Sequence, residues 1–174
     1  MKRALVLSMV LTAAVPALAD EFPNGLSPDG IGDVKIGMPV DKVELLLRDK
    51  LGYNQFISRG CSTLTTKKLE PSGLSVMIES KFLTRINVDY FGKSAIPETI
   101  KTTTGVGLGS TEADVMKAYP GARVKANPSD PTWHTIIADA PDHTKGIVFE
   151  TNGKTVKSMR AGAYPAIAYP NGCD

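Results

Sequence analysis

A weak internal repeat constrains the fold of this chain more than any other feature of its sequence. Residues 34–43 align with residues 106–115, an offset of 72 positions. In both segments an apolar residue and a glycine precede a helix start, and a valine follows. Glycine allows the unusual backbone angles that a tight turn into a helix requires. We therefore expect two similar helix entries, each opening one half of the protein.

Both helices have recognisable start signals. Pro39 suits the first turn of the first helix, and Thr111 with Asp114 resembles a capping box at the start of the second. The second helix should stop near residues 120–121, a Pro-Gly pair. Apolar residues of the first helix recur at helical spacing: Val40, Val43, Leu46, Leu47 and Leu51. Each helix is therefore expected to bury one face.

Strand-like segments follow each helix. In the first half they are residues 61–66, 74–79 and 84–90, and in the second half residues 134–138, 146–151 and 155–161. Residues 84–90 alternate apolar and polar side chains, which predicts one buried and one solvated face. Asn152 and Gly153 predict a two-residue hairpin turn. Residues 92–105 are the expected connector between the halves, and residues 127–131 a surface loop.

These patterns predict an α+β protein made of two helix-plus-antiparallel-meander repeats, with the helices packed on one face of the sheet. The repeats cover about residues 30–91 and 104–162, and residues 163–174 form a C-terminal tail. Together with the residues before them they constitute a single exported domain, residues 20–174.

The two helix entries also carry a resemblance to known proteins. The segments 36–38, Ile-Gly-Met, and 108–110, Leu-Gly-Ser, each followed by a helix and a meander, resemble the β-lactamase inhibitor protein fold. A single copy is similar to the small lipoprotein of the outer-membrane barrel-assembly machinery. The chain is similar as well to uncharacterised exported bacterial proteins that end in Gly-Cys, here residues 172–173. These resemblances imply a fold rather than an activity.

The first 19 residues have the pattern of a secretory signal peptide. Lys2 and Arg3 precede an apolar run over residues 4–15, and the small-residue motif Ala-Leu-Ala occupies residues 17–19. The run is shorter than the roughly 20 residues that a membrane-spanning helix needs. Asp20, rather than a cysteine, would be the first mature residue, so we expect no lipid anchor. We predict a periplasmic or secreted protein with no membrane insertion.

Cysteine content and charge narrow the classes of partner. Cys61 and Cys173 are the two cysteines, and in an oxidising compartment such a pair predicts a disulfide. The alternative, a reactive thiolate at Cys61, would need a neighbouring base that the local sequence lacks. After removal of the signal segment, 18 basic residues balance 18 acidic ones, since two of the 20 are removed with it. We therefore expect no nucleic-acid partner.

No catalytic, metal-binding or cofactor-binding motif appears in the sequence. The glycine-rich segment 105–110 lacks the Gly-Lys-Ser/Thr ending of a phosphate-binding loop, and a helix-entry turn explains it. His134 and His143 lie near Asp139 and Asp142, but their spacing matches no ligand motif. For His143, a place in a hairpin loop is the simpler interpretation.

Three aromatic residues are candidates for a binding surface: Trp133, Tyr164 and Tyr169. Such side chains are common binding anchors, although they pack in cores and at rims as well. The sequence predicts a non-enzymatic exported binding or inhibitor-like protein that acts on a protein or envelope component. One alternative is a small periplasmic hydrolase or metal-dependent enzyme that uses His134 or His143. Another is a structural envelope-assembly factor.

Overall fold

The structure is a computed structural model that describes residues 22, 25–58, 60–89, 100–170 and 172–173, without the side chains of residues 53–58. The expected signal peptide, residues 1–19, lies outside the described residues, as do residues 92–99 of the expected connector. None of the helices in the described part of the chain is long and apolar enough to cross a membrane.

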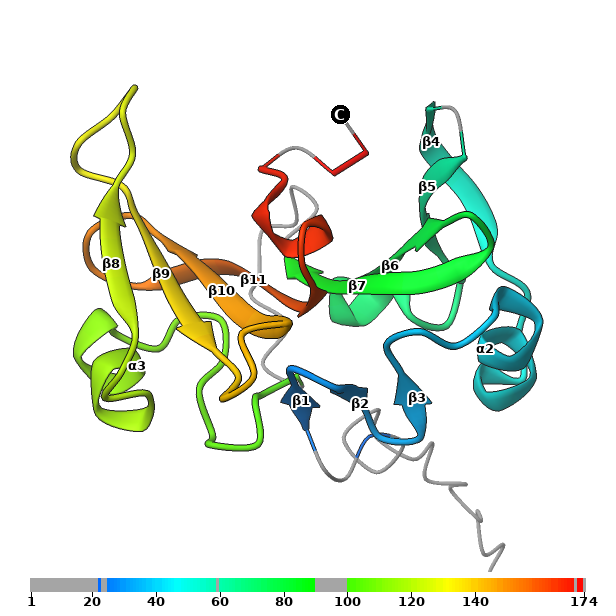
Figure 1. The fold of residues 1–174 in the computed structure, drawn as a ribbon, viewed down its shortest axis with the longest axis horizontal. Helices are drawn as coiled ribbons and strands as arrows, with labels where there is room; N and C mark the ends of the chain where they lie inside the picture. The colour runs from blue at the N-terminus through cyan, green and yellow to red at the C-terminus, as the bar shows by residue number, and fades with distance from the viewer. Residues whose placement is uncertain (1–21, 23–24, 59, 90–99, 171, 174) are drawn as a thin grey trace, which may run out of the picture.

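An eight-stranded antiparallel sheet forms the body of the protein (Figure 1). In the first half, helix α2 (Val40–Leu47) precedes β4 (Gly52–Ser58), β5 (Cys61–Thr65), β6 (Leu74–Glu79) and β7 (Phe82–Asp89). In the second half, α3 (Glu112–Ala118) precedes β8 (Arg123–Ala126), β9 (His134–Asp139), β10 (Lys145–Thr151) and β11 (Val156–Ala163). The strand order is β4-β5-β6-β7-β11-β10-β9-β8, so the last strands of the two halves pair at its centre. The expected α+β class with antiparallel strands is confirmed.

Short elements complete the fold. A three-stranded sheet contains β1 (Leu26–Ser27), β2 (Gly30–Ile31) and β3 (Val34–Lys35). The 3₁₀ turn η1 (Glu70–Ser72) precedes β6, and η2 (Ala166–Ala168) lies in the C-terminal tail. The amide of Leu26 donates to the carbonyl of Lys101 at 2.8 Å, which fixes the small sheet to the segment between the halves.

The two helix entries make the same kind of contact with the sheet. Gly37 and Gly109 both have left-handed backbone angles, with φ of 89° and 83°. The amide of Gly37 donates to the carbonyl of Leu83 at 2.7 Å, and the amide of Gly109 to that of Val156 at 2.9 Å. Leu83 and Val156 lie near the starts of β7 and β11. Each helix entry is thus attached to the last strand of its own half.

The helix ends differ from the sequence expectation at one point. The capping box is confirmed, because the Asp114 amide donates to the Thr111 hydroxyl at 3.1 Å and the Asp114 carboxylate accepts from the Thr111 amide at 2.9 Å. The first helix is shorter than expected: it ends at Leu47 because Arg48 adopts left-handed angles with φ of 52°. Leu51 therefore lies outside the helix, although its side chain is buried.

The small sheet β1–β3 was not expected from the sequence, and in the eight-stranded sheet two strands and one turn differ from the expectation. β4 and β8 extend each predicted meander from three strands to four. β8 is exposed along its whole length, so it has no alternation of buried and solvated residues to reveal it. The expected two-residue turn at Asn152 is wrong, because Thr151 pairs with Val156 and leaves four residues between the strands. The Asn152 side chain accepts from the Thr155 amide at 3.0 Å and stabilises this longer turn.

The main hydrophobic core lies on one face of the eight-stranded sheet. Strand residues such as Ile86, Ile136 and Phe149 are fully buried there. Val43 of α2 and Val115 of α3 belong to the same cluster. Since side chains alternate between the faces of a strand, the residues between these positions project to the opposite face. That opposite face carries the polar and charged residues from which the candidate site is built.

Candidate functional site on the concave face

We call the face opposite the main core the concave face, because the strands at both ends of the sheet rise around it in Figure 1. The pairing registers place one row of side chains across five strands of this face: Arg123, Ile137, Val148, Arg160 and Asn87. A second row runs through Asp139, Gly146, Gly162, Arg85 and Met77. Charged groups therefore lie at both the centre and the β8 end of the face.

The C-terminal tail fills the centre of the concave face (Figure 1). Ala166 and Ile167 of η2 are buried, and a second hydrophobic cluster joins Ala166 and Cys173 of the tail to Cys61 of β5 and Met77 of β6. The expected disulfide between Cys61 and Cys173 is present, with an Sγ–Sγ distance of 2.07 Å. The tail is thus packed against the sheet and covalently attached to its first half.

Two paired glycines make room for the tail. Gly146 of β10 and Gly162 of β11 lie opposite one another in the register, so neither projects a side chain onto the face. A Cβ at Gly146 would lie 3.3 Å from the Cδ1 atom of Ile167 and 2.8 Å from the carbonyl oxygen of Ala138. The missing side chain of Gly146 therefore leaves a gap that Ile167 of η2 occupies.

Two arginines beside this gap hold the tail by its main chain. Nη1 of Arg85 donates to the carbonyl oxygens of Ala166 and Tyr169, at 3.0 and 2.7 Å. Nε of Arg160 donates to the carbonyl oxygen of Ile167 at 2.7 Å. Hydrogen bonds from charged donors are stronger than neutral ones, so this clamp fixes a segment that would otherwise fray.

Arg85 remains charged despite its burial. Arg85 is 5% exposed, and burial followed by the charge of Arg160 lowers the pKa of Arg85 to about 10, which leaves it protonated at neutral pH. Arg160 forms an ion pair with Glu150 at 2.9 Å. The sequence pattern of β7 predicted that Arg85 and Asn87 would be solvated, and this is wrong because both are buried, Arg85 against the tail and Asn87 beside Ser75 of β6.

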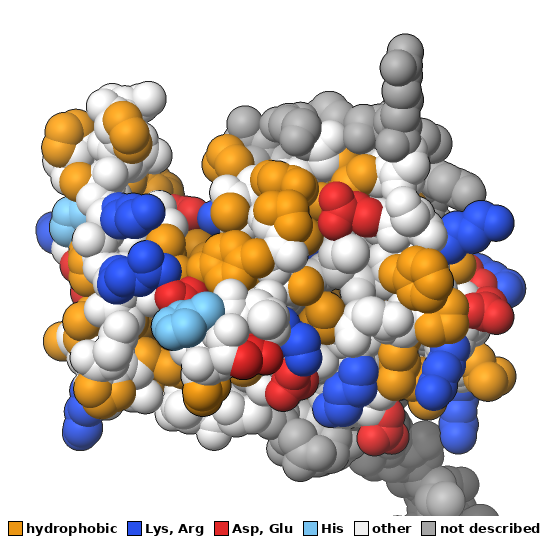
Figure 2. Space-filling view, in the orientation of Figure 1, with side chains coloured by type: hydrophobic (Ala, Val, Ile, Leu, Met, Phe, Trp, Pro, Cys, Tyr) orange, Lys and Arg blue, Asp and Glu red, His pale blue; other side chains and the backbone are white. Residues whose placement is uncertain are grey.

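The second half of the concave face keeps an open pocket of about 630 Å³. It is lined by residues of β8, β9, the β9–β10 loop and the tail: Arg123, Lys125, Ile137, Asp139, His143, Tyr164 and Ala168. Figure 2 shows the hollow between the β8–β9 arm, on the left, and the centre of the molecule, with basic, histidine and hydrophobic side chains near it.

Asp139 connects two other residues that line this pocket. Its carboxylate accepts from Nη2 of Arg123 at 2.6 Å and from the hydroxyl of Tyr164 at 2.6 Å. Partial burial acts to raise the pKa of Asp139, but the bonds from Tyr164 and Arg123 outweigh it and lower that pKa. Desolvation and the carboxylate raise the pKa of Tyr164. At neutral pH the pair is therefore an anionic acceptor and a neutral donor.

The three candidate aromatic residues lie in different places. Tyr164 is exposed and lines the pocket. Tyr169 packs against the second hydrophobic cluster, which joins the tail to β5 and β6. Trp133, which is 38% exposed, lies just before β9, whereas Asp139 of the pocket ends that strand. The structure therefore brings one of the three to the pocket.

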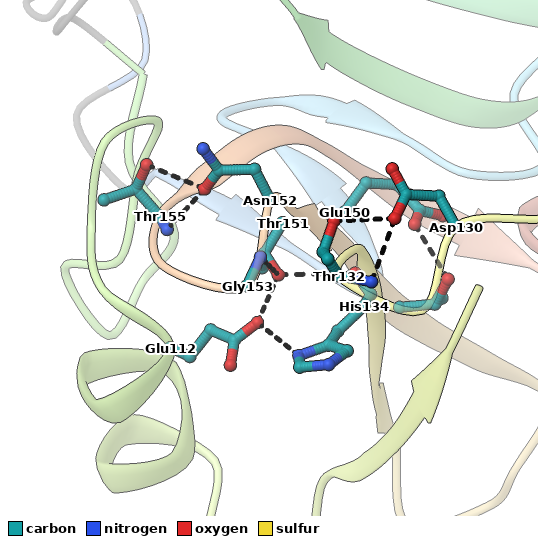
Figure 3. Close-up of polar contacts among 10 residues, drawn as sticks. Glu112, Asp130, Thr132, His134, Glu150, Thr151, Asn152, Gly153 and Thr155 are labelled. Atoms are coloured by element: carbon teal, nitrogen blue, oxygen red, sulfur yellow. Dashed lines mark hydrogen bonds and ion pairs between the residues drawn. The ribbon is translucent and has the colours of Figure 1, made fainter.

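The histidines occupy separate surroundings. His143 lies in the β9–β10 loop, as expected, with left-handed angles, and its Nδ1 is 3.7 Å from the Asp139 carboxylate. His134 of β9 contacts Glu112 of α3, with 2.8 Å between Nδ1 and Oε1. Figure 3 shows that Glu112 lies between His134 and Thr151, whose hydroxyl donates to the same carboxylate. The hydroxyl contacts the carboxylate rather than the imidazole, so His134 is not placed to take a proton from Thr151 directly. These contacts connect α3 to β9 and β10.

The glycine-rich segment uses its amides for hydrogen bonds within the fold. In the glycine-rich segment, the amide of Gly107 donates to the Ser110 hydroxyl at 3.0 Å, and that of Gly109 to Val156. Within the described ranges, no three histidine, cysteine or acidic side chains are placed to share a metal ion.

Sequence reasoning missed Arg85, Arg160, Arg123 and Lys125. A periodic signal existed only for Arg85, which alternates with apolar residues in β7. The others became neighbours through pairing of distant strands. Comparison of the chain with protein-family models, curated protein sequences and solved structures gave no match. The function is therefore inferred from the geometry of the concave face.

Proposed function

We propose that this chain is a non-enzymatic exported binding or inhibitor-like protein that holds a protein or envelope partner on its concave face. The observation that carries the proposal is the open pocket beside the tail. Its exposed residues Arg123, Lys125 and Tyr164 belong to a face that the main core does not use. A concave pocket with a few convergent polar groups is the usual form of a binding site.

The arrangement of the halves supports a duplicated unit. The equivalent bonds at Gly37 and Gly109, and the same helix-then-four-strands order in each half, favour two copies of one helix-plus-meander repeat. Val43 and Val115 join one core, which favours helices that both pack on the face opposite the tail. This is the organisation that the inhibitor-like resemblance implies, with the concave face left for a partner.

Export is supported by the disulfide between Cys61 and Cys173, since such bonds persist in oxidising compartments. The proposal includes cleavage after Ala19 and a mature chain that begins near Asp20 without lipid. Intact-mass measurement of protein from the periplasm tests this directly. Retention of residues 1–19, or added acyl mass, would contradict it.

The binding proposal is tested by capture from an envelope extract with matched charge-reversal variants. Lys125→Glu alters the pocket, whereas Lys154→Glu alters an exposed lysine of the β10–β11 turn that does not line the pocket. A specific partner should be captured by the unaltered protein and by Lys154→Glu and lost with Lys125→Glu. Equal capture by all three proteins, or no partner retained by any of them, would contradict binding through this face.

One observation favours a second candidate, a small hydrolase. His143 shares the pocket with a carboxylate, Asp139. The carboxylate already accepts from Arg123 and Tyr164, however, and among the described residues no serine, threonine or cysteine lines the pocket. Assays of the mature protein with ester, peptide and phosphate-ester substrates address this candidate. Turnover that is lost in His143→Ala and kept in His134→Ala would favour it over the binding function.

A further inference from the structure

The charges around the open pocket are not balanced. The Asp139 carboxylate pairs with Arg123 at 2.6 Å, which offsets the charge of that guanidinium. Among the residues that the structure describes, Lys125 has no ion-pair partner, and its side chain lies on the same face two positions along β8. His143 adds an exposed imidazole at 3.7 Å from Asp139. The lining of the pocket therefore carries one cationic group, that of Lys125, in excess.

The shape of the pocket adds an apolar requirement. Ile137 and Ala168 line it beside the exposed ring of Tyr164. The Tyr164 hydroxyl is engaged by Asp139, so the remaining ring surface offers contact area rather than a spare donor. A ligand that satisfies both the apolar residues and the excess cation needs a negative group at the end of a short aliphatic stem. A glutamate or aspartate side chain has this form.

We propose that the pocket is a carboxylate-binding subsite that accepts an acidic side chain of the partner protein, with Lys125 as the principal cationic contact and Ile137, Tyr164 and Ala168 contacting the stem. This inference rests on the proposed function, because it identifies which group of a protein partner enters the concave face. Its recognition chemistry is a charge-assisted hydrogen bond together with burial of a few apolar atoms.

The rigidity of the pocket supports this assignment. Tyr164 and Ala168 belong to the tail, which Arg85 and Arg160 hold through three main-chain carbonyls. Asp139 then connects the tail to β8 through Tyr164 and Arg123. A site whose walls are fixed before binding loses less entropy when a ligand enters. Lys125 takes part in none of these contacts, so its substitution tests recognition without disturbing the walls.

The test is an NMR titration of ¹⁵N-labelled oxidised protein with the peptide acetyl-Ala-Glu-Ala-amide. The matched probes are the same peptide with glutamine in place of glutamate, and inorganic phosphate. The glutamate peptide should shift the amides of Lys125, Ile137 and Tyr164 with a dissociation constant on the order of 1 mM. Lys125→Gln should weaken this binding about tenfold, as expected for loss of one charge-assisted bond, whereas Lys154→Gln should leave it unchanged.

Each other outcome overturns the inference. Equal shifts from the glutamine peptide would mean that the carboxylate is not recognised. An equal response to phosphate at the same amides would mean a non-selective cationic patch. No shift with any probe, or no effect of Lys125→Gln, would remove the subsite. If the peptide titration fails, the capture experiment with envelope extract still tests whether a partner binds the concave face. The two proposals can therefore fail separately.

Discussion

The two ends of the concave face differ although the same number of strands builds each half. From β6 across the centre to β10 the tail covers the sheet, and Met77, Arg85 and Arg160 are buried there. At the β8–β9 end Arg123 and Lys125 stay exposed around an open pocket. The disulfide from Cys173 reaches the first half only. The disulfide attaches the tail to the first half of the sheet, and the two ends of the concave face therefore have different surfaces.

The largest effect should come from removing that attachment. Cys61→Ser should lower the free energy of unfolding by roughly 2–5 kcal/mol, because the disulfide closes a loop of 112 residues. Cys173→Ser should have the same effect, with no further loss in the double variant. Urea denaturation followed by fluorescence of Trp133 measures this. Free thiols at both positions in periplasm-derived protein, or a disulfide-linked dimer, would contradict the assignment.

A second large effect is expected at Arg85. Arg85→Met keeps the approximate volume of the side chain but leaves the buried carbonyls of Ala166 and Tyr169 without their donor. We expect a loss of about 2–4 kcal/mol in unfolding free energy, since an unsatisfied buried group costs about 1–3 kcal/mol. Arg123→Met is the control on the open side, where an exposed ion pair contributes about 1 kcal/mol or less. Equal losses would mean that the tail does not depend on the clamp.

A smaller effect is expected at Gly146, where an added methyl group would meet both the sheet and the tail. Gly146→Ala would place a Cβ 2.8 Å from the Ala138 carbonyl and 3.3 Å from Ile167. We expect a loss of about 1–3 kcal/mol, measured by denaturation, together with faster hydrogen exchange in η2. Gly121→Ala is the matched control, because no atom lies within 4 Å of its added Cβ. Unchanged hydrogen exchange in η2 would mean that the space at Gly146 does not determine how the tail packs.

The smallest effect concerns the open side. Tyr164→Phe should cost about 1 kcal/mol at neutral pH through loss of the bond to Asp139. The pKa of Asp139 is lowered from its ordinary value of 3.8, so the stabilisation is present above that value and is lost as pH falls through the lowered pKa. The difference between the two proteins should therefore be full at neutral pH and shrink as the pH falls below 3.8. Denaturation curves from pH 7 to pH 2 test this, and a difference that grows as the pH falls would contradict it.

The sequence by itself determined the local and covalent features of this protein. Gly37 and Gly109 marked the helix entries, and Thr111 with Asp114 formed the predicted capping box. The cysteine pair indicated the disulfide, and the alternation over residues 84–90 indicated β7. Each of these signals depends on residues a few positions apart, or on a bond with a single possible partner, so it can be read along the chain.

Only the tertiary structure decided the surface on which function is proposed. Arg85 and Ala166 are separated by 81 positions, and Asp139 and Tyr164 by 25. β8 has no buried residue of its own and is placed by pairing with β9. No local pattern predicts that a tail will cover the centre of the sheet and leave its β8–β9 end open. Those contacts form because distant strands are brought into register, and the free energy of such contacts depends on neighbours that are remote in the sequence.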